Sequence, residues 1–354
     1  MTLKLNIRQR TEAREEDLSP YAVRSRLSRG RLKYEEPCPV RTAFQRDRDR
    51  IVHSKAFRRL KHKTQVFIAP LGDHYVTRLT HTLEVSQLAR TIARALNLNE
   101  DLAEAISLGH DLGHTPFGHV GEEVLNELYS GGFRHNEQSL RVVDLLEKDG
   151  QGLNLNWEVR DGILNHSKAR DGILKGSSGK AVTLEGQVCQ IADAIAYINH
   201  DIADAIRAGL FTEEELPPAA AAVLGHSHSQ RINTMVLDII KSSWAATGLK
   251  PTSGQPVIKM SPRVLEASNN LRHFLFERVY QTRGSKGRLA RGIVRQLYKH
   301  FRQHEDEMPP EYQRYSNDVE RRVVDYIAGM TDHYALRIAG KLRRQAKVGL
   351  KAIR

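Results

Sequence analysis

A stretch of sixteen residues holds most of the side chains that could carry chemistry in this chain of 354 residues. Residues 108–123 read LGHDLGHTPFGHVGEE, and four glycines punctuate the stretch. Within thirteen positions it contains these potential ligands and proton carriers: His110, Asp111, His114, His119 and Glu122. Imidazole and carboxylate groups together bind divalent metals, and a further His–Glu pair suits acid–base or nucleophilic work. We therefore expect the fold to bring these side chains together in a site for metal binding or acid–base chemistry.

Helical periodicity predicts two helices, one that begins at His81 and one that ends at the His-Asp pair. From residue 80 to 96 the apolar residues recur with the 3.6-residue period of a core-facing helix, and Thr80 is the expected N-cap. His81 then lies at the start of this helix. The next helix begins at Glu100 and carries the His-Asp pair of residues 110–111 to its C-terminal end.

A third helix is expected over residues 117–129. Thr115 and Pro116 before it form a cap and a favourable first position. His119 and Glu122 fall three residues apart on this helix, which places them on one face.

Further helical patterns cover residues 133–148, 157–165 and 183–210, and three or four more run from about residue 229 to the end. The sequence therefore predicts an all-α fold. The clearest break in composition is a Pro-Pro pair followed by alanines at 217–222. We expect an N-terminal arm over 1–40, a helical domain over 41–215 and a further helical region over 216–354.

The composition is that of a soluble globular protein, with 40% hydrophobic and 27% charged residues. Two cysteines, Cys38 and Cys189, provide no disulfide framework, which favours a reducing compartment. The N-terminus lacks an apolar signal segment, and no window approaches 18 apolar residues. These features predict a cytoplasmic protein that does not cross a membrane.

A net charge of +12 favours polyanionic partners, which include nucleotides, nucleic acid and acidic membrane surfaces. Residues 41–63 carry nine Lys or Arg side chains against two Asp. This segment is either a solvated helix with one buried stripe or a basic wall beside a phosphate site or a nucleic-acid track. The charge alone does not choose between them.

A lone histidine or aspartate on a helix is usually a solvated or hydrogen-bonded structural residue. Here, however, the His-Asp pair at 110–111 follows an apolar run, and Asp193 has apolar neighbours on both sides. Buried acids and imidazoles cost free energy unless they are paired or bound to metal. One metal ion held by His81, the His-Asp pair and Asp193 would explain all these residues together.

The pattern H…HD…D, together with HDLGHTPFGHVGEE, resembles the HD-domain metal-dependent phosphohydrolases. Within that superfamily the chain is most similar to the deoxyguanosinetriphosphate triphosphohydrolase family. The resemblance implies an HD-domain helical phosphohydrolase fold over 41–215, followed by additional phosphohydrolase-associated helices. It also implies four metal ligands: His81, His110, Asp111 and Asp193. The metal would be Mn²⁺ or Mg²⁺, with Co²⁺, Ni²⁺ or Fe²⁺ also suited to mixed nitrogen and oxygen ligands.

The same resemblance assigns roles to further residues. His119 would be the catalytic histidine, Glu122 its orienting partner and His114 a neighbour of the phosphates. The remaining matches would bind substrate. Arg78 would bind the phosphates, and Gln65, Tyr197 and Asp201 would recognise the sugar and its 3′-hydroxyl. His135 and Asn136 would provide a further polar contact.

The implied reaction converts a deoxynucleoside triphosphate, dGTP being one candidate, and water into a deoxynucleoside and tripolyphosphate. One alternative is an HD phosphohydrolase that acts on monophosphates, cyclic nucleotides or guanosine polyphosphates. Another is a basic nucleic-acid-binding protein with a vestigial HD site. The family also suggests a homo-oligomer, a hexamer or tetramer, and the basic segments suggest single-stranded DNA as an added partner.

Overall fold

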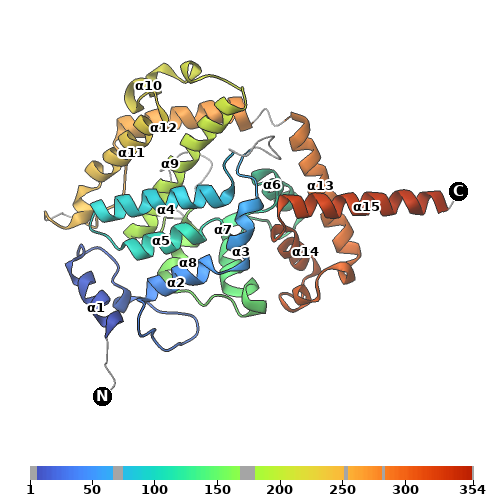
Figure 1. Cartoon of the computed structure of the whole chain (residues 1–354), viewed down its shortest axis with the longest axis horizontal. Helices are drawn as coiled ribbons and strands as arrows, with labels where there is room; N and C mark the ends of the chain where they lie inside the picture. Colours follow the sequence, from blue (N-terminus) through green and yellow to red (C-terminus); the bar gives the residue numbers. More distant parts are fainter. Residues whose placement is uncertain (1–5, 67–74, 168–179, 251–253, 281–283, 353–354) are drawn as a thin grey trace. The chain divides into compact units, whose positions relative to one another are not determined.

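The computed structural model describes residues 6–66, 75–167, 180–250, 254–280 and 284–352. It is 69% helical, with fifteen α-helices and no strand over these ranges, which confirms the all-α prediction (Figure 1). The chain forms two compact units, each assembled from three separate segments. Unit 1 comprises Met1–Ser54, Thr80–His110 and Leu153–Thr282, and unit 2 comprises Lys55–Leu79, Asp111–Gly152 and Arg283–Arg354.

Unit 1 is built around the long helix α9. Its helices are α1 (Ile7–Arg14), α2 (Ala43–Val52), α4 (Arg78–Ala95, apart from its first two residues), α5 (Glu100–Gly109), α8 (Trp157–Asn165), α9 (Leu184–Arg207), α10 (Pro218–Leu224), α11 (His228–Ser242) and α12 (Pro262–Leu275). Helix α5 packs on α2, α8 and α9, and α9 also contacts α11 and α12 (Figure 1). Ile106 of α5 and Ile195 of α9 are both completely buried.

The sequence explains where α9 begins and ends. The side chain of Thr183 accepts a hydrogen bond from the backbone N–H of Gly186, which satisfies one of the free amides of the first turn. The helix stops at Arg207, and Gly209 follows with a φ of 70°, a left-handed conformation that glycine adopts without strain. The prediction of a helix over 183–210 is therefore confirmed with slightly shorter ends.

Buried carboxylates hold the N-terminal residues of unit 1. Glu15 accepts hydrogen bonds from the backbone and hydroxyl of Ser25. Glu185 of α9 accepts from the backbone of Val23, and Glu158 of α8 accepts from Arg29. These side chains satisfy backbone amides that no regular structure pairs.

Unit 2 contains the other six helices that the structure describes: α3 (Lys55–Arg59), α6 (His119–Leu128), α7 (His135–Arg141), α13 (Gly284–Gln303), α14 (Val319–Ala328) and α15 (Asp332–Ala352). Helix α13 packs against α6, α14 and α15. The core at these contacts is hydrophobic and includes Val124, Leu125, Leu297 and Ile327. The helix that carries His119 is thereby fixed to the C-terminal helices.

The predicted start of the third helix is wrong. Helix α6 begins at His119 because the two residues before it, Phe117 and Gly118, have left-handed φ angles of 64° and 57°. The Thr115 hydroxyl donates to the carbonyl of Gly118 at 2.9 Å and does not cap a helix at Pro116. A tight turn therefore separates the His-Asp pair from α6.

Other helix ends differ less from the predictions. Helix α4 begins at Arg78, two residues before the expected N-cap. The pattern over 133–148 corresponds to α7, which continues as a π-helical turn over Val142–Leu146. Helix α8 matches its predicted range of 157–165.

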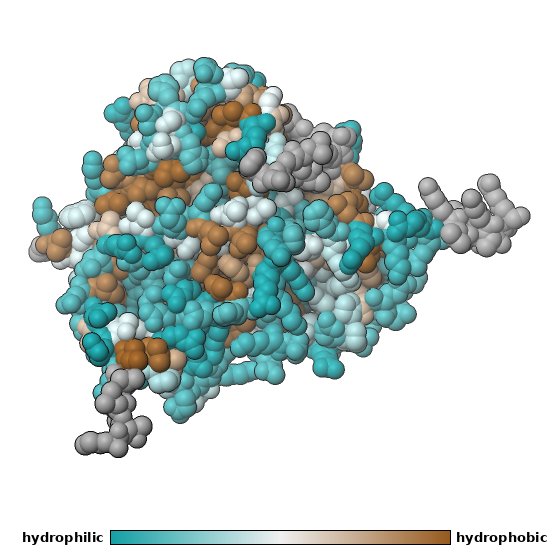
Figure 2. All heavy atoms as spheres, in the orientation of Figure 1, coloured by the Kyte–Doolittle hydropathy of each residue, from teal (hydrophilic) through white to brown (hydrophobic). Residues whose placement is uncertain are grey.

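The visible face of the protein is mostly hydrophilic, with separate apolar patches (Figure 2). Exposed apolar side chains include Leu83, Leu249 and Phe276. Among the described residues, no helix combines the length and the apolar character needed to cross a membrane.

Candidate active site

In unit 1, two predicted metal ligands from different helices lie side by side. His81 is in the first turn of α4, Asp193 is in the middle of α9, and His81 Nε2 lies 3.2 Å from Asp193 Oδ1. The His81 side chain is buried, whereas 21% of the Asp193 side chain remains exposed. The ring centroids of His81 and His110 are 5.4 Å apart. Three of the four predicted ligands therefore belong to one cluster in unit 1.

The orientation of His110 suits a metal ligand. His110 directly follows α5, and its Nδ1 lies 2.6 Å from the carbonyl oxygen of Ser107. A proton on Nδ1 that is donated to this carbonyl leaves the lone pair on Nε2, which is the tautomer that binds a cation. His166 has the same arrangement, with Nδ1 2.7 Å from the carbonyl of Ile163, and its ring lies 4.9 Å from His110.

A further histidine, His200, contacts the ring nitrogen of His81 that does not face Asp193. His200 Nε2 lies 2.8 Å from His81 Nδ1, and His200 Nδ1 lies 2.7 Å from Asp201 Oδ1. Burial would lower the pKa of His200, but the Asp201 carboxylate outweighs it and raises this pKa above its usual value. When neutral His200 accepts the proton of His81 Nδ1, the lone pair of His81 Nε2 is left for a cation, which is how a second ring nitrogen orients a ligating imidazole.

No motif of the sequence predicted a role for His166 or His200. A signal for His200 was present, since it lies seven residues after Asp193 on α9, two turns along the same face. His166 lies on no element with another predicted ligand, and only the packing of α8 on α5 brings it near His110.

Farther along α9, two predicted sugar-binding residues meet side chains from distant parts of unit 1. The Tyr280 hydroxyl donates a hydrogen bond to Asp201 Oδ2. Arg272 of α12 hydrogen-bonds to Tyr197, and burial raises the pKa of Tyr197, so that its hydroxyl stays protonated at neutral pH. No local sequence pattern predicts the contacts of Tyr280 and Arg272, because each of these residues lies far in the sequence from its partner on α9.

In unit 2, a buried arginine contacts the aspartate of the His-Asp pair. Arg78 Nη1 lies 2.5 Å from Asp111 Oδ2, and His114 Nε2 lies 3.3 Å from Asp111 Oδ1. The His114 ring stacks on His135 with centroids 4.0 Å apart. Burial, Arg78 and His135 together lower the pKa of His114 well below its usual value, so His114 is neutral at pH 7.

Glu122 lies between two histidines. Its Oε2 lies 3.2 Å from His119 Nδ1, and its Oε1 lies 2.8 Å from both the ring Nδ1 and the backbone nitrogen of His135. Burial would raise the pKa of Glu122, but the neighbouring histidines hold it far below its usual value. The same carboxylate raises the pKa of His135 although that ring is buried.

His119 remains accessible in this arrangement. Its side chain is 54% exposed, whereas only 16% of the Glu122 side chain is exposed. Ring or carboxylate atoms of His114, His119 and Glu122 approach within 4.8 Å of one another. The geometry thus offers a histidine that is oriented by a partly buried anion and open to a ligand.

The turn before His119 accepts only glycine at position 118. A Cβ there would lie 3.2 Å from both Arg78 Nη2 and the Gln65 carbonyl oxygen, and 3.3 Å from the Thr64 carbonyl oxygen. The backbone of Gly118 therefore packs directly on two predicted substrate-binding residues.

The structure divides the predicted site residues between the units. Unit 1 contains His81, His110, Asp193, Tyr197 and Asp201, and unit 2 contains Gln65, Arg78, Asp111, His114, His119, Glu122, His135 and Asn136. The boundary falls at the peptide bond between His110 and Asp111. Gln65 is buried, and its Oε1 has no hydrogen-bond partner among the described residues. Asn136 is partly buried in the first turn of α7.

Two family models match the chain: the HD domain over residues 78–198 and the phosphohydrolase-associated domain over residues 258–341. A deoxyguanosinetriphosphate triphosphohydrolase-like protein of Caldanaerobacter subterraneus subsp. tengcongensis is 59% identical over 339 residues, which are 94% of each chain. Proteins of the same description from Desulfatibacillum aliphaticivorans and Clostridium perfringens are 49% and 50% identical. They align with 94% and 90% of this chain and with 96% and 91% of their own lengths.

These matches confirm the resemblance that the HDLGHTPFGHVGEE stretch indicated, and they extend over nearly the whole chain. The chain belongs to the HD-domain family of deoxyguanosinetriphosphate triphosphohydrolase-like proteins.

Proposed function

We propose that this protein is a metal-dependent triphosphohydrolase that converts deoxynucleoside triphosphates, dGTP among them, into deoxynucleosides and tripolyphosphate. One observation carries the proposal: half-exposed His119 is oriented by partly buried, ionised Glu122, in the same unit as the Arg78–Asp111 pair. The description that the relatives share supports the substrate class.

The residues that would hold the metal are His81, His110, Asp111 and Asp193. The donor set fits a divalent cation, because two imidazoles and two carboxylates supply mixed nitrogen and oxygen ligands. Ser107 fixes the His110 tautomer that leaves Nε2 for a cation, which supports the assignment. When bound, Mn²⁺ or Mg²⁺, with Co²⁺, Ni²⁺ and Fe²⁺ as further options, supplies a Lewis acid that polarises the α-phosphate.

Arg78 and His114 suit the phosphates. The Arg78 guanidinium is buried, so its charge acts on a phosphate oxygen with little screening by water. His114 is neutral at pH 7 and has one buried ring nitrogen, Nδ1, without a hydrogen-bond partner among the described residues. Because Nε2 of this neutral ring lies 3.3 Å from the Asp111 carboxylate, the single ring proton belongs on Nε2, and Nδ1 would accept a hydrogen bond beside the phosphates.

Hydrolysis breaks the bond between the α-phosphorus and the 5′ oxygen, and the departing oxygen must take up a proton. His119 acts here as the nucleophile or as the general acid and base. Glu122 keeps the His119 ring in one tautomer and stabilises its protonated form.

The sugar would be recognised by Gln65, Tyr197 and Asp201, with His135 and Asn136 as the next polar contact. Tyr280 and Arg272 extend this set, because they hold Asp201 and Tyr197. A homo-oligomeric state, binding of single-stranded DNA and a cytoplasmic location stay predictions.

The decisive experiment incubates the purified protein with Mn²⁺ and each of the four dNTPs, singly and mixed, and identifies the products by anion-exchange chromatography and ³¹P NMR. We expect a deoxynucleoside and tripolyphosphate. Orthophosphate or pyrophosphate as the product, or no consumption with any metal, would refute the proposal.

The variant H119A should lose turnover and still bind metal, since His119 is not among the proposed ligands. The matched control H304A changes an exposed histidine of unit 2 and should retain turnover. Loss of metal from H119A would count against the assignment of His119.

A further inference from the structure

An aspartate far away in sequence holds the turn that precedes His119. Asp332, the first residue of α15, is buried, and its Oδ1 accepts the backbone N–H of Phe117 at 2.9 Å. Its Oδ2 accepts the backbone N–H of Thr64 at 3.0 Å and also the Thr64 hydroxyl. One carboxylate thus binds the residue before Gln65 and a residue two positions before His119.

The Phe117 amide needs such a partner. Phe117 has a φ of 64°, a left-handed conformation in which the Cβ of a non-glycine residue crowds its own backbone. A buried N–H without an acceptor adds a further free-energy cost, because the hydrogen bond that it makes to water in the unfolded chain is not replaced. The hydrogen bond to Asp332 therefore stabilises a conformation that the local sequence does not favour.

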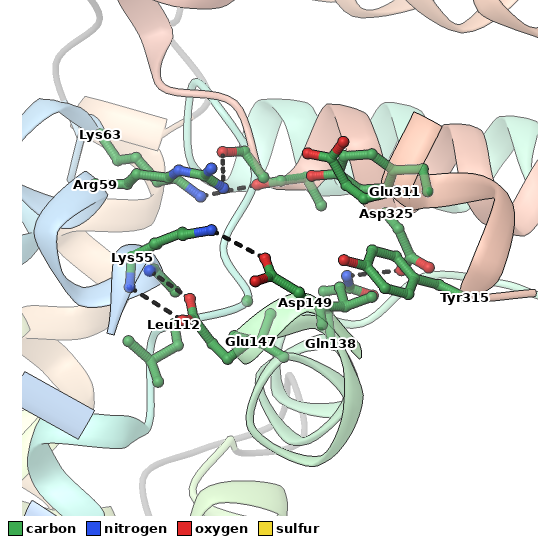
Figure 3. A pocket seen from close by; sticks show the side chains of 17 residues that line it. Lys55, Arg59, Lys63, Leu112, Gln138, Glu147, Asp149, Glu311, Tyr315 and Asp325 are labelled. Atoms are coloured by element: carbon green, nitrogen blue, oxygen red, sulfur yellow. Dashed lines mark hydrogen bonds and ion pairs between the residues drawn. The ribbon is translucent and has the colours of Figure 1, made fainter. Parts of the chain in front are cut away.

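Lys63 provides a second tie between the same parts of unit 2. Its buried ammonium donates to the carbonyl oxygen of His114 and, at 2.8 Å, to that of Ala328, the last residue of α14. Lys63 and Arg59 lie together on one side of a cavity of about 60 Å³, which Leu112 and Gly113 of the HDLGH segment also line (Figure 3). The end of α14 and the start of α15 thus hold the HDLGHTPFG segment at two points.

We propose that Asp332 is a positioning residue for hydrolysis, which sets the turn at Phe117 and Gly118 and thereby the placement of His119 toward the substrate. Lys63 holds the segment before this turn through the carbonyl oxygen of His114. The phosphohydrolase-associated region, which includes residues 328 and 332, then holds the turn before His119 in its conformation. This inference rests on the proposed function, because it takes His119 as the reacting residue.

The role predicts a particular kinetic signature. Asp332 contacts the backbone of Phe117 and of Thr64 and the Thr64 hydroxyl, so its removal acts first on the backbone of the turn before His119 and reaches Arg78 and Gln65 only through that backbone. In D332A we expect kcat to fall at least tenfold while KM changes less than threefold. In D332N one amide keeps an acceptor and the other faces an NH₂ group, so an intermediate kcat is expected.

The matched control is D318A. Asp318 also starts a helix of the same region, since its side chain accepts the N–H of Glu320 at the beginning of α14. Loss of this cap weakens the start of α14, whereas the contact itself is with Glu320 and not with the turn before His119. D318A should therefore lower the melting temperature and leave kcat unchanged.

Hydrogen exchange measured by mass spectrometry tests the contact independently of activity. Peptides that cover residues 112–118 should exchange faster in D332A than in the wild type, and D318A should match the wild type there. Unchanged exchange in these peptides, or unchanged kcat in a folded D332A, would overturn the inference. If D332A does not fold, D332N decides by the same two measurements.

The two proposals fail in different ways. A wild-type protein that hydrolyses no dNTP refutes the proposed function and, with it, the catalytic part of this inference. Wild-type turnover combined with a D332A variant that keeps kcat refutes only the role of Asp332.

Discussion

His119 Nδ1 lies 3.2 Å from Glu122 Oε2, three residues farther along helix α6. The other oxygen of this carboxylate is engaged by the backbone and ring of His135. Because the histidines hold the pKa of Glu122 far below its usual value, the carboxylate is ionised at neutral pH. One anion therefore orients two imidazoles.

The first prediction concerns the substitution E122Q. The amide keeps the shape of the side chain but loses the charge that stabilises a protonated His119, so turnover should fall by roughly 10²–10⁴-fold, the usual range for acid–base assistance. Steady-state kinetics with the preferred dNTP would measure the loss. Metal content should stay at the wild-type level, since Glu122 is not a proposed ligand.

E123Q is the matched control for this prediction. Glu123 is the next residue of α6 and pairs with Arg291 on the surface of unit 2. Its kcat should equal that of the wild type. Equal turnover in E122Q and E123Q would show that the carboxylate of Glu122 does not assist His119.

The sequence predicted the local parts of the site well. Periodicity located α4, α5 and α9, and the spacing of three residues placed His119 and Glu122 on one face. Such signals are local, because one helical turn connects the residues concerned. The turn at Phe117 was missed, since the local pattern Thr-Pro resembled a helix start and the stabilising acceptor lies 215 residues away.

Other contacts of the site had no local signal for the same reason. Tyr280 is 79 residues from Asp201, and Lys63 is 265 residues from Ala328. Tertiary packing alone decides which side chains meet over such distances. The family resemblance supplied the roles of the motif residues, but not the residues that hold the motif in place.

The second prediction concerns metal binding. Mn²⁺ that binds only the folded protein should stabilise it by about 2.7 kcal/mol at a concentration of 100 times Kd. D193A removes the carboxylate next to His81 and should abolish this stabilisation, because a proposed ligand is lost. Thermal unfolding with and without Mn²⁺, together with metal analysis, measures both effects.

D204N serves as the control for metal binding. Asp204 lies on the same helix α9 and pairs with Arg207, outside the proposed ligand set. It should show the wild-type shift with Mn²⁺. A full Mn²⁺ shift in D193A would remove Asp193 from the ligand set.

The third prediction concerns the glycine before α6. G118A should destabilise the protein by about 1–3 kcal/mol, because its φ of 57° and ψ of −132° suit glycine alone. The new Cβ would also press on Arg78 Nη2 at 3.2 Å, so KM should rise if Arg78 binds the phosphates. Denaturant unfolding and steady-state kinetics measure the two effects.

The comparison variant G292A has the opposite expectation. Gly292 lies inside α13, and a Cβ there meets no atom within 4 Å. Alanine favours a helix over glycine by about 1 kcal/mol, so this variant should be more stable than the wild type. A G118A variant as stable and active as G292A would contradict the argument from the turn.

The fourth prediction concerns pH and stability in unit 1. Glu185 is completely buried; its Oε1 accepts the backbone N–H groups of Val23 and Asn99, and its Oε2 has no hydrogen-bond partner among the described residues. Burial raises the pKa of Glu185 from 4.5 to about 7. Between these two values the folded protein binds a proton that the unfolded chain has lost, so stability falls as pH rises through this window.

E185Q removes this pH dependence. The glutamine side chain carries no charge, and its oxygen can still accept the backbone N–H groups of Val23 and Asn99. It should be roughly 1–3 kcal/mol more stable than the wild type at pH 8, and the difference should vanish near pH 4.5. Denaturant unfolding at pH 5, 6, 7 and 8 measures the trend, with E137Q on the exposed surface of α7 as the control that should show none. A gap between E185Q and the wild type that stayed constant with pH would mean that the buried carboxyl keeps its ordinary pKa.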